Sequence, residues 1–106
     1  MHAMIRRYSV ADDDVAEVMH RCDAEFADQL AAQPGFIDYQ LFAGGDGTMT
    51  SITIFETEDQ ASASTDLASR WISASLTDLR LDRQEAFGGE VQVSRAADAV
   101  LRPTHA

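Results

Sequence analysis

The chain has 106 residues, and eighteen acidic side chains against eight basic ones give it a net charge of −10. This length is that of a single domain. The charge disfavours binding to nucleic acid or to an anionic membrane, because both are themselves negative. All the basic side chains are arginines, so Schiff-base chemistry, which needs a lysine, is excluded.

The single cysteine, Cys22, excludes a disulfide within the chain and is typical of a reducing compartment. No stretch approaches the roughly 20 apolar residues of a membrane span. The first residues also lack the apolar run of a secretory signal. We therefore expect a cytoplasmic protein that does not associate with membranes.

The first elements are expected to be a strand and a helix. The segment of residues 2–10 is short and rich in apolar side chains, which predicts the strand. The three aspartates at 12–14 are typical of a helix N-cap and first turn; a metal site would need a second acid-rich segment. The helix that follows carries one apolar stripe, formed by Val15, Val18, Met19, Cys22, Phe26 and Leu30.

Two residues of this helix need a choice between a chemical and a structural role. Cys22 lies within the stripe, so we expect a small buried hydrophobic side chain rather than a nucleophile. His20 lies off the stripe, three residues before Asp23, which is the spacing of two metal ligands. A third ligand is missing, so we expect a solvated histidine and no metal site.

Pro34 and Gly35 end this helix, and a β-hairpin is expected next. Its strands are residues 36–43 and 48–55, joined by the glycine-rich turn at 44–47. Glycine-rich loops bind phosphate when a helix begins directly after them. Here a β-branched run follows, so we expect a hairpin turn and no phosphate site.

Both hairpin strands carry apolar side chains on both faces. We expect Ile37, Tyr39 and Leu41 on one face of the first strand, with Phe36 and Phe42 on the other. A face exposed to water should be polar at alternate positions. The face that helices leave uncovered therefore needs a partner, and we expect a homodimer joined through the sheet faces.

The second helix is expected from residue 58 to about residue 81, because Thr57 and Gln60 have the spacing of a capping box. Its inward arc is predicted to contain Ala61, Ser64, Leu67, Ala68, Trp71, Ile72, Ser75, Leu76 and Leu79. A very large side chain, Trp71, stands there among small ones. Small residues either let a helix approach a sheet closely or leave space beside a large neighbour, and both alternatives remain open.

The end of the chain is expected to form a loop and a last strand. Residues 83–89, with paired glycines, predict the loop, and Glu90–Arg95 predict a strand with Val91 and Val93 inward. We expect residues 1–96 to form the single domain and residues 97–106 to be a flexible C-terminal tail.

The predicted order of elements is β-α-β-β-α-β, which is the split βαβ or ferredoxin-like plan. Right-handed crossovers then place both helices on one face of a four-stranded antiparallel sheet. The expected fold class is therefore α+β.

The chain resembles the antibiotic-biosynthesis-monooxygenase-like family. The similar residues are Pro34-Gly35-Phe36, the segment from Gly44 to Thr57, and the segment from Asp66 to Leu76 with its tryptophan. The resemblance implies a dimeric α/β barrel built from the ferredoxin-like unit. Members include cofactor-free oxygenases of phenolic or quinol-like polyketides and haem-degrading enzymes.

The resemblance also implies a site between the sheet and the helices. Cofactor-free members place an Asn, a Trp and Tyr residues there; Trp71 and Tyr39 match, but this chain contains no Asn. Haem-degrading members need an Asn on a strand and a His in the second helix. The histidines here are His2, His20 and His105, all outside that helix. We therefore expect no cofactor and no metal.

The function implied is cofactor-independent oxygenation of a small aromatic substrate, a phenol, a hydroquinone or a polyketide-like molecule. Arg6 or Arg95 would stabilise an anion if either points inward. The expected ligand-binding residues are Trp71, Tyr39, Ser64, Leu67, Ala68 and Ser75; no catalytic residue is assigned. Two alternatives remain open: a non-catalytic dimer that binds a small apolar molecule, which the missing Asn favours, and a structural or regulatory dimer without a cavity. Core packing is the other interpretation of Trp71, and it is compatible with a role in the site.

Overall fold

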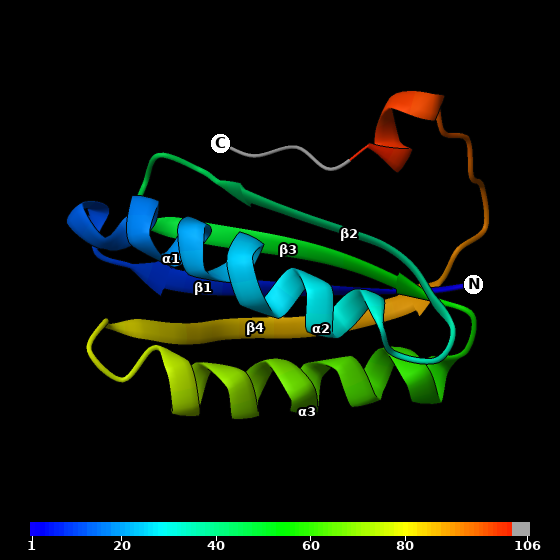
Figure 1. The fold of residues 1–106 in the computed structure, drawn as a ribbon. Coiled ribbons are helices and arrows are strands. Elements are labelled where there is room, and N and C mark those ends of the chain that lie inside the picture. The colour runs from blue at the N-terminus through cyan, green and yellow to red at the C-terminus, as the bar shows by residue number, and fades with distance from the viewer. Residues whose placement is uncertain (103–106) are drawn as a thin grey trace.

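The computed structural model describes residues 1–102. A four-stranded antiparallel sheet has the order β2-β3-β1-β4. Its strands are β1 (His2–Val10), β2 (Phe36–Ala43), β3 (Thr48–Phe55) and β4 (Leu81–Glu90). The helical elements are η1 (Asp12–Asp14), α1 (Val15–Arg21), η2 (Cys22–Phe26), α2 (Ala27–Ala31), α3 (Glu58–Ser75) and η3 (Asp98–Leu101). The order of elements and the central β1 confirm the predicted ferredoxin-like α+β fold (Figure 1).

The first three strands and the hairpin turn lie where they were predicted, but the end of the chain does not. Helix α3 ends at Ser75 rather than near residue 81, and β4 occupies the segment expected to be a loop. Val93, expected inward on a last strand, lies beyond β4 and is 77% exposed. β4 is an edge strand, exposed along nearly its whole length, and edge strands carry charged side chains that hide the alternating pattern.

One of the glycines that suggested a loop has a different role. A Cβ at Gly88 would lie 2.5 Å from the Ala3 carbonyl oxygen on β1. Glycine within a strand often marks such a close approach of two backbones. The expected flexible tail at 97–106 stays a prediction: η3 covers 98–101, and residues 103–106 lie outside the described part of the chain.

The first helical run is interrupted by η2, a single π-helical turn. In a straight α-helix, residues four apart drift by about 40° around the axis. The buried side chains Val18, Cys22, Phe26 and Leu30 are each four apart. The wider π turn opposes this drift and keeps all of them directed at the sheet. The aspartates at 12–14 form η1, whose N-cap is Ala11, and Asp14 is the N-cap residue of α1, as expected, although its side chain makes no capping hydrogen bond.

A β-bulge at Ile37 changes the predicted faces of β2. Phe36 pairs with Phe55 and Tyr39 pairs with Thr53, so both lie on the face covered by the helices. The Phe36 and Phe55 rings pack edge to face at 5.8 Å. The expectation that Phe36 lies opposite Tyr39 was therefore wrong, because strict alternation takes no account of an inserted residue.

The other face of the sheet is apolar along its centre. The register aligns Gln40, Ile52, Ile5 and Phe87 in one row across the four strands. Phe42 and Phe87 are 51% and 55% exposed. Both helical runs pack on the opposite face, where the core residues lie.

Arg21 joins the two helical runs. It donates to both carboxylate oxygens of Asp78 at 2.7 and 2.8 Å and to the Ser75 carbonyl at the end of α3 at 3.1 Å. These bonds satisfy one of the unpaired carbonyls of the α3 C-terminus. The hydrogen bonds from Arg21 lower the pKa of Asp78 to about 2.

Helix α3 begins with the predicted capping box. The Thr57 hydroxyl accepts from the Gln60 amide at 3.2 Å, and Gln60 Oε1 accepts from the Thr57 amide at 3.1 Å. Gly35 packs against this cap with a φ of +78°, and a Cβ there would collide with the Gln60 side chain. The turn after the first helical run thus fixes the start of the second.

Gly35→Ala is expected to lower the free energy of unfolding by about 1–3 kcal/mol, because the variant adds a left-handed alanine and displaces the capping glutamine. Gly45→Ala is the matched control: its φ is +79°, but a Cβ there would have no atom within 4 Å. Denaturant titration of both variants should show the larger loss for Gly35→Ala. Equal losses would mean that the contact with Gln60 contributes nothing.

Candidate functional site

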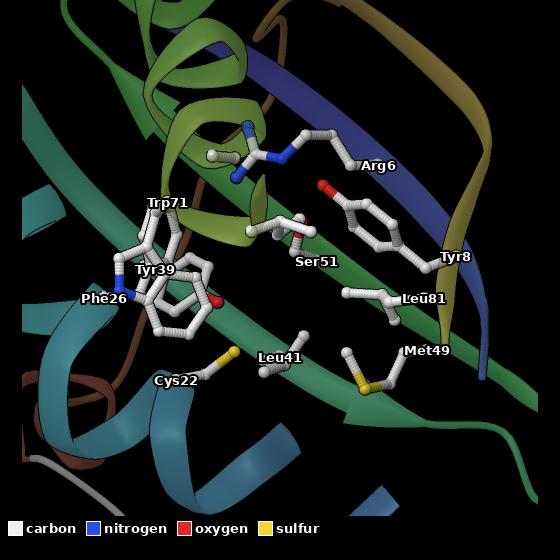
Figure 2. Close-up of a pocket in the computed structure, with 12 residues that line it drawn as sticks. Arg6, Tyr8, Cys22, Phe26, Tyr39, Leu41, Met49, Ser51, Trp71 and Leu81 are labelled. Atoms are coloured by element: carbon white, nitrogen blue, oxygen red, sulfur yellow. The ribbon is translucent and has the colours of Figure 1, made fainter. Parts of the chain in front are cut away.

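A cavity of about 20 Å³ lies between the helices and the helix-covered face of the sheet (Figure 2). This volume holds about one water molecule. Side chains from all four strands, η2 and α3 form its walls: Arg6, Tyr8, Cys22, Phe26, Tyr39, Leu41, Met49, Ser51, Ala68, Trp71, Ile72 and Leu81.

One wall is aromatic. The Phe26 ring lies 5.3 Å from that of Trp71, and it packs edge to face with Tyr39 at 5.8 Å. Figure 2 shows these three rings together on one side of the cavity. Phe26 reaches this position through the π turn, which directs it at the sheet. Aromatic pairs of this geometry add stabilisation beyond the burial of their area.

The expected ligand-binding residues separate into two groups. Trp71, Tyr39 and Ala68 line the cavity, whereas Ser64, Leu67 and Ser75 do not. The inward arc of α3 is longer than the cavity, so several of its residues pack elsewhere. Ser64 is buried, donates to the Ala61 carbonyl at 2.5 Å, and also borders a separate groove of about 260 Å³ beside Gln33 and Pro34.

Arg6 is an unusual wall residue, because it is an arginine with only 1% of its surface exposed. Its guanidinium donates to Thr53 Oγ1 at 3.1 Å, Ser64 Oγ at 3.2 Å and Thr65 Oγ1 at 3.4 Å. Arg6 shares a strand face with the buried Tyr8, so it is the one of the two anion-stabilising candidates that points inward. Arg95, the other anion-stabilising residue considered, lies beyond β4 and is exposed.

The ionisable groups beside Arg6 are neutral near pH 7. Burial raises the pKa of Tyr39 far above its usual range and that of Cys22 to about 12. Burial also raises the pKa of Tyr8, although the neighbouring Arg6 lowers it in part. Figure 2 shows the Tyr8 hydroxyl directed toward the guanidinium. Arg6 is therefore the charged side chain of the cavity wall, whose residues include no Asp or Glu.

Three buried polar atoms in the described part of the chain lack a hydrogen-bond partner: Arg6 Nε, Ser51 Oγ and Trp71 Nε1. All three belong to residues that line this one cavity. Buried polar groups are nearly always paired, so each such exception needs an explanation. Two of the three are donors only, and the cavity therefore suits a ligand atom that accepts hydrogen bonds.

The histidines lie away from the cavity. His2 Nδ1 is 3.9 Å from Glu90, His20 is exposed on α1, and His105 lies outside the described residues. Residues 1–102 contain no group of three His, Cys, Asp or Glu side chains placed to hold a metal ion. Within the same residues, no helix has the length and hydropathy to cross a bilayer.

The family model for antibiotic biosynthesis monooxygenases matches residues 1–70. That match covers more than half of the chain, and the chain belongs to this family. No sequence among curated proteins matches it closely.

Solved structures share the fold at low sequence identity. SnoaB, a cofactor-independent oxygenase from Streptomyces nogalater, has a TM-score of 0.65 at 17% identity, covering 88% of this chain and 94% of that one. An MhuD variant with two manganese protoporphyrin IX molecules per active site has a TM-score of 0.69 at 18% identity, covering 92% and 100%. A dimeric ferredoxin-like protein from an uncultured marine organism has a TM-score of 0.66 at 8% identity, covering 91% and 98%.

Proposed function

We propose that the protein is a cofactor-independent monooxygenase that acts on a small phenol or hydroquinone in the cavity beneath α3. Family membership supports the class of reaction, and SnoaB is a cofactor-independent oxygenase of the same fold. The observation that carries the proposal is the cavity itself. It has an aromatic wall, and the unpaired polar atoms all belong to residues that line it.

The chemistry needs no bound cofactor, because a deprotonated phenol is electron-rich enough to reduce O₂ itself. A phenol and O₂ give a quinone and water. One oxygen atom bonds to a ring carbon, and the other leaves as water with one hydrogen from that carbon and one from the phenol hydroxyl. The protein binds the ring, stabilises the phenolate charge and excludes bulk water. In this proposal Trp71 and Tyr39 form the ring-binding wall, and Arg6 faces the developing charge.

Haem does not fit this site. An axial ligand to haem iron is a His, Cys, Met or Tyr side chain. No histidine lines the cavity, burial holds Cys22, Tyr8 and Tyr39 in their neutral forms, and Met49 is the one remaining side chain of these types in the wall. No step of the proposed reaction passes through haem.

A second candidate is a non-catalytic protein that binds a small molecule in the same cavity. The chain contains no asparagine, although the family's oxygenases place one in their pocket. The cavity is also small in the absence of a ligand. Binding of an aromatic ligand without consumption of oxygen would favour this candidate.

We also propose that the protein is a homodimer joined through the open sheet faces. The row Ile52, Ile5 and Phe87 presents apolar side chains there, flanked by the Arg7–Glu85 ion pair. Exposed apolar patches of this kind mark interaction sites, and a second copy offers the same patch by two-fold symmetry. The ferredoxin-like protein from the marine organism is likewise dimeric.

Trp71→Phe tests the proposed activity, because it keeps an aromatic ring but removes the indole N–H. Oxygen uptake by a panel of one- to three-ring phenols and hydroquinones should fall by about tenfold, the value of one hydrogen bond of roughly 1–1.5 kcal/mol. Chelator is present throughout, and autoxidation without protein is subtracted.

Leu79→Met, a change on the same side of the fold outside the cavity wall, should leave uptake unchanged. Isotopically labelled O₂ should deliver one labelled atom to the product. Absence of uptake above the blank across the whole panel would reject the oxygenase. If Trp71→Phe leaves oxygen uptake unchanged, the indole of Trp71 does not take part in the site.

A further inference from the structure

The charge on Arg6 is not offset by anything in its surroundings. Its hydrogen bonds to Thr53, Ser64 and Thr65 and its interaction with the Tyr8 hydroxyl all involve neutral groups. Within residues 1–102 it forms no ion pair. Burying a cation is costly unless an anion replaces the solvation that water gave it. The neighbouring arginine on β1, Arg7, is paired as charged side chains usually are: it is half-exposed and lies 2.6 Å from the carboxylate of Glu85.

The cavity wall cannot provide the missing negative charge. It contains no carboxylate, and its tyrosines and cysteine are held neutral by burial. A single trapped water would accept hydrogen bonds from Arg6 but would bring no charge. What would complete the site is therefore an acceptor atom with a full negative charge.

We propose that the cavity is an anion site that selects aromatic ligands carrying an oxyanion, held between Arg6 and Ser51. These residues are direct partners across β1 and β3, so their side chains project from neighbouring points on one sheet face. The unpaired Arg6 Nε donates to the oxyanion and Ser51 Oγ adds a second hydrogen bond. The inference rests on the proposed function and narrows its substrate class to phenolates and aromatic carboxylates.

The size of the cavity fits this assignment. About 20 Å³ accepts an oxygen-sized group, so the ring of the ligand must displace side chains of the wall. Leu41 is the register partner of Ser51, and Met49 is that of Tyr8. Figure 2 shows both on the side of the cavity away from the Arg6 guanidinium, and methionine adapts readily to a new shape. The aromatic group of Phe26, Tyr39 and Trp71 is the surface on which a ring stacks.

The test compares two ligands of equal shape, benzoate and benzamide, by calorimetric titration and by the emission of Trp71, the single tryptophan of the chain. Benzoate should bind at least tenfold more tightly than benzamide. A second arm uses 4-nitrophenol, whose phenolate alone is yellow. Binding should raise the fraction of phenolate at fixed pH, whereas selection of carboxylates alone would leave its colour unchanged.

Arg6→Met should erase the preference for benzoate, and Arg7→Met, the neighbouring arginine on the open face, should keep it. Circular dichroism checks that both variants are folded. Ser51→Ala provides an independent test if Arg6→Met does not fold: it should weaken benzoate binding several-fold and leave benzamide unaffected.

Equal affinity of the wild-type protein for benzoate and benzamide, binding of neither, or a preference that survives Arg6→Met would each overturn the anion site. These outcomes are separate from the oxygen assay. Anion preference without oxygen uptake rejects the oxygenase alone, and oxygen uptake from neutral ligands without anion preference rejects the anion site alone.

Discussion

Ile52→Asp is expected to convert the protein from a dimer to a folded monomer. Ile52 lies in the central row of the open sheet face, between Ile5 and Gln40. An uncompensated carboxylate buried in the proposed interface costs about 3 kcal/mol or more in each protomer. Two-fold symmetry places it there twice, so dimerisation weakens by roughly 10⁴-fold, since about 1.4 kcal/mol corresponds to a factor of ten.

Sedimentation at micromolar concentration measures this effect directly. The wild-type protein should have about twice the chain mass of 11.6 kDa, and the variant should have the mass of one chain. Ser73→Asp, which adds the same charge on the exposed side of α3, should stay dimeric. A wild-type monomer, or a variant that stays dimeric, would show that this face is not the interface.

Ser51→Asp is expected to have little effect on stability in the wild-type protein and to be strongly destabilising in the Arg6→Met background. In the wild-type protein the new carboxylate lies beside Arg6 and supplies its missing counter-charge, so the fold should be retained with little change in stability. In the Arg6→Met background the same carboxylate is buried without a partner, which costs about 3–5 kcal/mol. Denaturant titration of the single and double variants gives the coupling energy between the two positions.

The same substitution should abolish benzoate binding, because the carboxylate of residue 51 then occupies the place of the ligand oxyanion. A coupling energy below about 0.5 kcal/mol would mean that the two side chains do not meet in the cavity. That result would contradict the geometry on which the anion site depends.

The fold could be predicted where hydrophobic periodicity was strong. The stripe of the first helical run, the two hairpin strands and the capping box at Thr57 all lie where the patterns placed them. β4 could not be predicted, because an exposed edge strand has no apolar alternation. The bulge at Ile37 was equally hidden, since an inserted residue reverses the phase of a strand without a marker in composition.

The candidate site was predictable only in part. An aromatic side chain on an apolar arc identifies a position such as Trp71, which lines the cavity, but it cannot say which residues of that arc face the same space. Ser64 and Ser75 were predicted to bind the ligand, but neither lines the cavity. The inward direction of Arg6 depends on the phase of β1, and the adjacent Arg7 made either phase acceptable. Ser51 became visible only through the register that pairs it with Arg6.

The buried guanidinium of Arg6 gives the molecule opposite signs of charge inside and outside. The chain carries a net charge of −10, so its exterior field repels anions at distances of about a Debye length, roughly 8 Å in physiological salt. Small, strongly hydrated anions such as phosphate have no apolar surface with which to offset that repulsion and the loss of their water. Aromatic anions do, because their rings leave water favourably. The exterior field therefore repels all of these anions, and it is the apolar wall around Arg6 that would favour an aromatic anion over phosphate in the proposed site.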